Sequence, residues 1–226
     1  AGIDLGQPWG RFGELRFGLA ALRVRARPTL VAASLASDLT PIVDTEVGLR
    51  LAAVIDQLNF ASFPTRGYRV VSELAFGENR SAGRFQRLEA SVLGAKSFGA
   101  HTVSLYGLVQ GASTREASRF GRFDLGGFQQ LSGYRDGELT GNYVLFGRVA
   151  WYLKLPYAPT IARAFFVGAS AEIGNAWATR EDFREGSLRT GMSVFFGADS
   201  GLGPLYLALT HAPRGRSRVV LFLGRP

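Results

Sequence analysis

The sequence contains no cysteine, only two histidines and no long apolar run. The absence of cysteine excludes a disulfide framework and any metal site built on thiolates. No segment approaches the roughly 18 to 20 consecutive apolar residues that a membrane-spanning helix requires. If this chain crosses a membrane, it therefore crosses as β-strands.

Charged residues are few and scattered, at 19% of the chain. Lysine and arginine number 26 against 18 aspartates and glutamates, which gives a net charge of +8. Such a balance often indicates nucleic-acid binding. Here the arginines stand singly along the chain and form no basic run, so nucleic acid is not expected as a partner. A basic surface or a basic barrel lumen fits this distribution better.

Apolar and polar residues alternate over segments of about 8 to 14 residues, which is the signal of half-buried β-strands. In 45–56, for example, one face carries Val47, Leu49, Leu51, Ala53 and Ile55. Glu46, Arg50 and Asp56 fall on the opposite face, because successive side chains of a strand point to opposite sides. The segment 14–27 alternates in the same way but changes phase at Leu22, which predicts a β-bulge there.

The alternation predicts an all-β protein with about eleven strands. The expected strands are 3–9, 14–27, 45–56, 68–77, 85–97, 102–111, 143–155, 161–173, 187–198, 205–211 and 217–224. Short connections, such as 10–13 and 63–67, are expected to alternate with long ones, such as 28–44, 78–84 and 112–142. This arrangement is typical of outer-membrane barrels, which have short periplasmic turns and longer extracellular loops.

A soluble β-sandwich or a lipocalin-like barrel is the alternative, with the apolar face turned inward. Two observations favour the membrane barrel. The less apolar face carries charges and glycine in many strands, which suits a wet and crowded lumen. The strands are also long enough for the roughly 9 to 11 residues that a tilted membrane strand needs.

Three motifs add a family resemblance. The connection 112–142 contains Phe123-Asp124-Leu125-Gly126-Gly127, followed by Leu131-Ser132-Gly133-Tyr134-Arg135. Earlier in the chain stands Phe63-Pro64-Thr65-Arg66-Gly67-Tyr68, and later Glu172-Ile173-Gly174-Asn175-Ala176-Trp177. In this order they resemble the lumen loop, a periplasmic turn and a strand end of the BamA/TamA outer-membrane superfamily, also called surface antigens. The resemblance implies that Pro64, Arg66 and Gly67 form the turn, and that Glu172 on the barrel wall receives the loop tip.

The loop tip departs from the superfamily pattern at one position. Ser132 stands where the resemblance leads us to expect an arginine that pairs with the wall carboxylate, here Glu172. Serine can still donate a hydrogen bond to a carboxylate, and Arg135 is a second candidate donor. The form Leu-Ser-Gly-Tyr most resembles the C-terminal barrels of bacterial patatin-like proteins, the type Vd autotransporters. Those proteins carry an N-terminal phospholipase and a POTRA domain on the same chain.

The resemblance implies an antiparallel transmembrane barrel of sixteen strands, of which residues 1–226 hold about eleven, so the first strands and any POTRA or lipase domain are expected to be missing. A smaller closed barrel, with 29–37 as a further strand, is the alternative. The implied function is a membrane anchor and translocator for an attached patatin-like phospholipase domain. The alternatives are an outer-membrane assembly or two-partner secretion pore, and less favoured, a passive porin.

The sequence offers no candidate catalytic, cofactor or metal site. A patatin lipase needs a Gly-x-Ser-x-Gly elbow, and none is present, so no enzymatic activity is expected of this chain. The expected location is the outer membrane of a Gram-negative bacterium. The expected partners are its lipids and lipopolysaccharide, the assembly machinery during biogenesis and the passenger domain, and homo-oligomerisation is left open.

Overall fold

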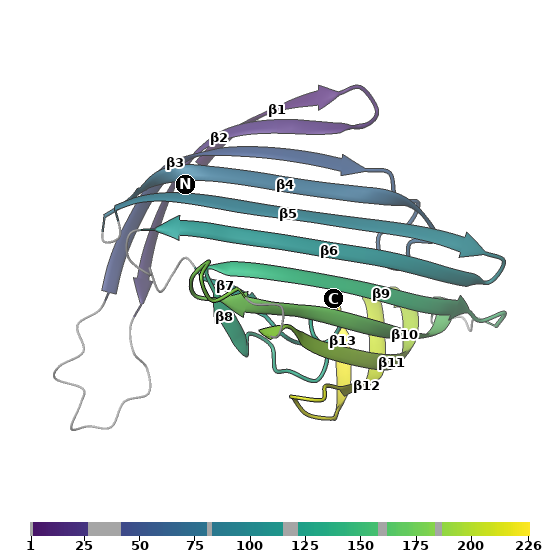
Figure 1. Ribbon diagram of the computed structural model, residues 1–226. Coiled ribbons are helices and arrows are strands. Elements are labelled where there is room, and N and C mark those ends of the chain that lie inside the picture. Colours follow the sequence, from purple (N-terminus) through teal and green to yellow (C-terminus); the bar gives the residue numbers. More distant parts are fainter. Residues whose placement is uncertain (1, 27–41, 81–82, 115–121, 158–161, 184–186) are drawn as a thin grey trace.

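The computed structural model describes residues 2–26, 42–80, 83–114, 122–157, 162–183 and 187–226. Eleven strands of these residues form one antiparallel sheet, as the sequence predicts (Figure 1). They are β1 (Gly2–Trp9), β2 (Gly13–Ala26), β3 (Ile42–Asp56), β4 (Arg66–Asn79), β5 (Gly83–Phe98), β6 (His101–Thr114), β9 (Tyr143–Lys154), β10 (Ala162–Trp177), β11 (Arg189–Ser200), β12 (Gly203–His211) and β13 (Arg218–Leu223). The described residues contain no α-helix, and therefore no helix long and apolar enough to cross a membrane.

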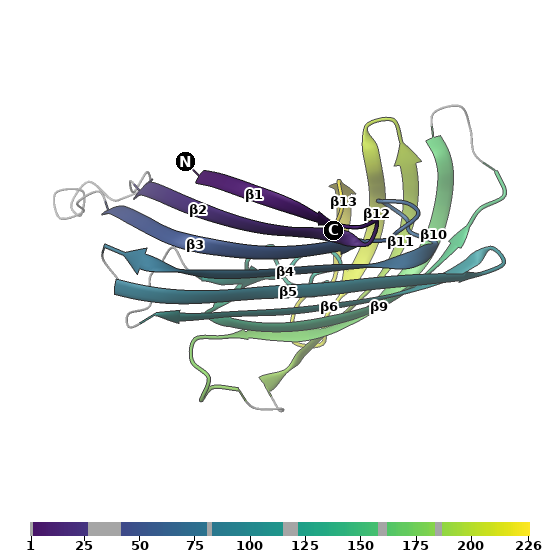
Figure 2. The same cartoon turned by 90° about the horizontal axis from the view of Figure 1, so that it is seen from above.

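Each strand pairs with its neighbour in the chain, except where β6 pairs with β9. Two short strands, β7 (Phe123–Leu125) and β8 (Leu139–Gly141), form a separate hairpin inside the connection between them. Figure 2 shows that the large sheet curls strongly, and its edge strands β1 and β13 are not paired with each other. The β7–β8 hairpin packs against β9 and β10.

The two faces of the sheet differ as the alternation predicts. The convex face carries large apolar side chains that remain exposed, including Leu5, Leu19, Leu49, Leu51, Val92, Leu105, Val149, Leu207 and Leu209. In water such a surface would be unfavourable, but against hydrocarbon it costs nothing. The concave face carries polar contacts, for example the ion pair of Arg50 Nη2 with Glu73 Oε2 at 2.5 Å and the hydrogen bond from Gln110 Nε2 to Glu89 Oε2 at 2.9 Å.

Two buried clusters lie on the concave side, against β6 and β9 to β12. The first contains Phe63, Phe128, Tyr152, Ala164, Phe166, Phe195, Tyr206 and Ala208. The second contains Ala112, Phe123, Leu125, Leu131, Tyr134, Val144, Phe146 and Ala212. Both clusters mix strand residues with residues from connections, so this part of the interior of the curved sheet is packed with chain.

Some details of the sequence-based prediction are wrong. The register of β2 is continuous with both β1 and β3, so no bulge occurs at Leu22. The register shift lies instead between Ala162 and Ala164 on β10. The connection expected at 78–84 shrinks to 80–82, because β4 and β5 extend into it. The segment 29–37, the alternative additional strand, lies outside the described residues.

Candidate functional site

The long connection after β6 folds back onto the concave face of the sheet. Its β7–β8 hairpin places Phe123 and Leu125 in the second buried cluster, and Leu125 is 1% exposed. The residues between the two short strands form the loop tip, defined here as 126–138. Inside this tip Leu131 and Ser132 are completely buried. Burial of a loop tip is unusual because its backbone polar groups need partners away from water.

The tip backbone is bent into conformations that side chains disfavour. Gln129 and Leu131 have φ angles of 58° and 81°, although neither is glycine. Each such residue costs about 1–3 kcal/mol and persists only where the surroundings impose it. In this conformation the successive N–H groups of Leu131 and Ser132 point at one acceptor, in the manner of a backbone anion nest.

That acceptor is the carboxylate of Glu172 on β10, which is 3% exposed. Its Oε2 accepts the Leu131 N–H at 2.9 Å and the Ser132 N–H at 2.5 Å. Its Oε1 accepts the Ser132 hydroxyl at 2.9 Å and the Ser170 hydroxyl at 2.5 Å. A buried carboxylate is tolerated when its oxygens receive donors in this way, so the tip and the wall satisfy each other.

Glycines allow the tip to approach the wall this closely. Gly133 has a φ of 93°, and a Cβ there would lie 2.5 Å from the backbone nitrogen of Ala212. On β11, a Cβ at Gly191 would lie 2.4 Å from the carbonyl oxygen of Ser132. The carbonyl of Gly133 also accepts the N–H of Arg216 at 3.0 Å. The tip is therefore held by β10, by β11 and by the connection after β12.

Arg148 on β9 is a wall contact that the sequence did not reveal. The register pairs Arg148 directly with Glu172. Its Nη1 donates to the carbonyl oxygen of Gln129 at 2.9 Å. The cation beside the wall carboxylate thus comes from the neighbouring strand and not from the loop. The signal that could have found it is its place on the inner face of the predicted strand 143–155.

Of the two candidate donors to Glu172, the structure uses Ser132 and not Arg135, and the expectation about the Tyr134 hydroxyl is wrong. Arg135 is exposed, its N–H donates to Glu138 Oε2 at 2.6 Å, and the donors to Glu172 come from other residues. Tyr134 is buried as expected, but its hydroxyl has no hydrogen-bond partner among the described residues. Its ring instead lies below the Arg189 guanidinium, 5.4 Å from the ring centroid.

The turn motif lies at the opposite end of the strands from the long connection. Gly67 has a φ of 106°, and a Cβ there would lie 2.0 Å from the carbonyl oxygen of Gln57. The Asn59 side chain closes the turn by accepting the N–H groups of Thr65 and Arg66, each at 3.0 Å. The motif residues Pro64, Arg66 and Gly67 therefore stand in one turn, with Pro64 buried and the Arg66 side chain exposed.

The turn folds inward, which the sequence did not predict. Phe63 is 5% exposed and stacks on Phe166, with ring centroids 4.1 Å apart. The Tyr152 hydroxyl donates to the carbonyl of Pro64. Phe63 and Phe128 each lie 5.2 Å from the ring of Tyr206, measured between centroids. An aromatic bridge of Phe63, Tyr206 and Phe128 thus connects the turn with the loop tip.

Among the described residues, no group of three or more histidine, aspartate or glutamate side chains could hold a metal ion. What the arrangement provides is the fixation of a loop. A loop is fixed inside a curved antiparallel sheet that is apolar outside and polar inside. These features define an outer-membrane β-barrel.

Comparison with known proteins identifies the family. The Omp85 superfamily domain matches residues 1–214, so the chain belongs to the Omp85 superfamily. A similar solved structure is that of BamA from Haemophilus ducreyi lacking POTRA domains 1–3, with a TM-score of 0.78 at 12% sequence identity. The alignment covers 98% of this chain, which spans about half, 52%, of that BamA chain. No curated protein matches this sequence.

Proposed function

We propose that this chain anchors a patatin-like phospholipase domain in the outer membrane and serves as its translocator. The observation that carries this proposal is the loop tip at Ser132. Its hydroxyl and N–H both bond Glu172, at 2.9 and 2.5 Å, and no cation from the described part of the loop takes part. The Leu-Ser-Gly-Tyr tip is the form that resembles patatin-linked barrels, and the geometry explains how serine can serve at this position.

The filled interior supports an anchoring role over passive transport. The loop tip and the turn meet at the aromatic bridge, where Tyr206 is 3% exposed. A porin needs a continuous aqueous passage, whereas these side chains occupy part of the space within the curved sheet. Under this proposal the passenger domain and the assembly machinery are the protein partners, and membrane lipids and lipopolysaccharide surround the barrel. The sixteen-strand total stays a prediction.

The alternative is an assembly or secretion pore of the same superfamily. The similarity to BamA favours it as the second candidate, although at 12% identity this similarity concerns the fold alone. In that case the loop tip would leave its wall contacts during transport. The two functions differ in what precedes the barrel on the same polypeptide.

Reading the coding sequence upstream of Ala1 tests the proposal directly. A Gly-x-Ser-x-Gly lipase domain followed by a POTRA domain is the expected result. Tandem POTRA domains without a lipase would overturn the proposal and support the assembly or secretion pore. A functional test complements this reading. Deleting the barrel from the full-length protein should abolish surface exposure of the lipase, measured by antibody binding to intact cells.

A further inference from the structure

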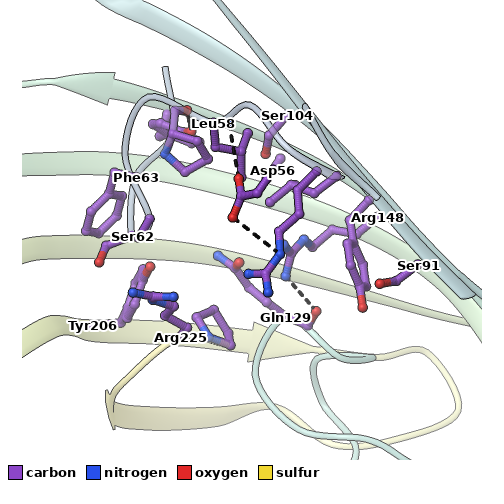
Figure 3. Close-up of a pocket in the computed structure, with 18 of the residues that line it drawn as sticks. Asp56, Leu58, Ser62, Phe63, Ser91, Ser104, Gln129, Arg148, Tyr206 and Arg225 are labelled. Atoms are coloured by element: carbon purple, nitrogen blue, oxygen red, sulfur yellow. Dashed lines mark hydrogen bonds and ion pairs between the residues drawn. The ribbon is translucent and has the colours of Figure 1, made fainter. Parts of the chain in front are cut away.

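A cavity of about 400 Å³ lies on the concave face, between the loop tip and the inward-folded turn (Figure 3). Gln129 borders it from the tip, and Phe63 and Pro64 border it from the turn. Its walls carry the guanidinium groups of Arg69 and Arg148, and Arg225 adds a third. Asp56 also lines the cavity, and of these charged groups only Arg148 has a contact described above as fixing the loop.

Arg69 and Arg148 belong to one row of residues across the sheet. Successive register pairs give the row Asp56, Arg69, Leu93, Tyr106, Arg148 and Glu172 on β3, β4, β5, β6, β9 and β10. Adjacent strands are about 4.8 Å apart, so three spacings separate the two arginines by about 14 Å at the backbone. Between them lie only the uncharged Leu93 and Tyr106, while a carboxylate flanks each arginine on its outer side.

Both arginines keep a buried donor without an acceptor. The Nε atoms of Arg69 and Arg148 have no hydrogen-bond partner among the described residues. The Arg69 Nε lies 3.6 Å from Asp56 Oδ2, which makes an ion pair but is too long for a hydrogen bond. Arg148 uses Nη1 for the Gln129 carbonyl and places its guanidinium 5.2 Å from the centroid of the Tyr106 ring.

The acceptors of the row are already engaged. Glu172 receives four donors from the tip and from Ser170, and Asp56 Oδ1 accepts the Leu58 N–H at 3.2 Å. A guanidinium has five N–H donors and no acceptor. A buried donor left unpaired is unfavourable, so the middle of the row favours a ligand that brings acceptor oxygens.

We propose that this cavity binds an oxyanion, either a carboxylate or a phosphate group, between the guanidinium groups of Arg69 and Arg148. The Nε of Arg69 faces Asp56, so its Nη groups, together with the Nε edge of Arg148, are the donors that can pair with the oxygens of such a group. The hydroxyls of Ser91 and Ser104 also face the cavity and supply further donors. This site goes beyond the anchoring function, and it can exist whether or not a lipase domain precedes the barrel.

Calorimetric titration of the full chain, refolded in detergent micelles, tests the proposal. The two probes are inorganic phosphate and an end-blocked peptide with a single glutamate, compared with the same peptide carrying glutamine. We expect at least one oxyanion probe to bind, and its affinity to fall about tenfold or more in Arg69→Gln and Arg148→Gln. Arg50→Gln is the control, because Arg50 pairs with Glu73 and does not line this cavity.

The pattern of binding identifies the source of the oxyanion. Binding of the glutamate peptide, but not of its glutamine counterpart, points to an acidic polypeptide segment in the lumen. Binding of phosphate alone points to a free anion. If neither oxyanion probe binds, or if both arginine variants bind as the parent does, the proposal is wrong.

A second variant guards against a folding defect, since Arg148 also holds the loop tip. Ser91→Glu places a carboxylate in the cavity, and Ser91→Gln adds nearly the same volume without charge. We expect Ser91→Glu to weaken phosphate binding about tenfold or more and to melt at a higher temperature than Ser91→Gln. Equal melting temperatures together with unchanged phosphate binding would overturn the proposal.

Discussion

The buried carboxylate of Glu172 is stabilised by its hydrogen-bond donors, and replacing one of its oxygens disturbs these bonds. In Glu172→Gln, one carboxylate oxygen becomes an NH₂ group, which cannot accept from Ser170 and Ser132 or from the backbone N–H groups of the tip. A buried donor left unsatisfied costs about 1–3 kcal/mol, so we expect a loss of this order. Denaturant unfolding in lipid or detergent measures it. Glu181→Gln is the control, because Glu181 is exposed, and equal losses in both variants would contradict the assigned contacts.

Gly133 makes a second residue-scale prediction. Gly133→Ala adds a Cβ that would lie 2.5 Å from the Ala212 nitrogen, at a φ of 93° that alanine disfavours. We expect a destabilisation of about 1–3 kcal/mol, because the strain and the clash both oppose the native tip. Gly201→Ala provides the matched control, since a Cβ at Gly201 meets nothing within 4 Å. A melting temperature that is the same in both variants would argue against a tip packed on the wall.

The sequence indicated some of these contacts and not others. Ser132 and Glu172 could be linked by a motif, because each motif occupies a contiguous stretch of chain. Arg148 could not be linked to them, since its place beside Glu172 follows from the register of two strands, which alternation alone leaves undefined. The Tyr134 hydroxyl was expected to find a partner from a general rule about buried tyrosines, and the packing beneath Arg189 overrides that rule.

At the scale of elements, the eleven strands of the large sheet were predictable because apolar and polar residues alternate along them. The hairpin of β7 and β8 was not, since three residues are too few to show a period. The bulge expected at Leu22 was wrong for another reason. Leu22 is an apolar residue on the inner face, so the alternation looks shifted there. The pairing of β2 with β3 nevertheless continues without a break from Gly13 to Ala26.

The orientation of β3 supports a prediction about the whole strand. Leu51 is 42% exposed on the convex face, whereas Ala52 lies on the concave face with Arg50. Arginine at Leu51 should destabilise the barrel by about 2–4 kcal/mol if the residue lies near the bilayer midplane, because a cation would enter hydrocarbon. Arginine at Ala52 should cost much less. Refolding into lipid vesicles measures both, and equal costs would contradict a lipid-facing convex surface.

At the scale of the whole molecule, we predict that residues 1–226 have no hydrolase activity of their own. The sequence has no Gly-x-Ser-x-Gly elbow, and the described residues contain no metal-binding cluster. We expect residues 1–226, purified and refolded, to leave phospholipid and ester substrates intact in a fatty-acid release assay. Turnover that a serine substitution within this chain abolishes would overturn the expectation. Turnover that survives every such substitution would instead indicate a contaminating lipase.

The position of the loop tip in the chain has a consequence for the order of folding. The tip precedes its binding partners, since Glu172 lies 40 residues after Ser132, and Ala212 and Arg216 come later still. The turn is separated from its partner by more of the chain, because the Pro64 carbonyl accepts its hydrogen bond from Tyr152, 88 residues away. Contacts so distant in sequence form late and slow the search for the native state. The loop tip and the turn therefore reach their final positions only after the later strands that hold them have formed.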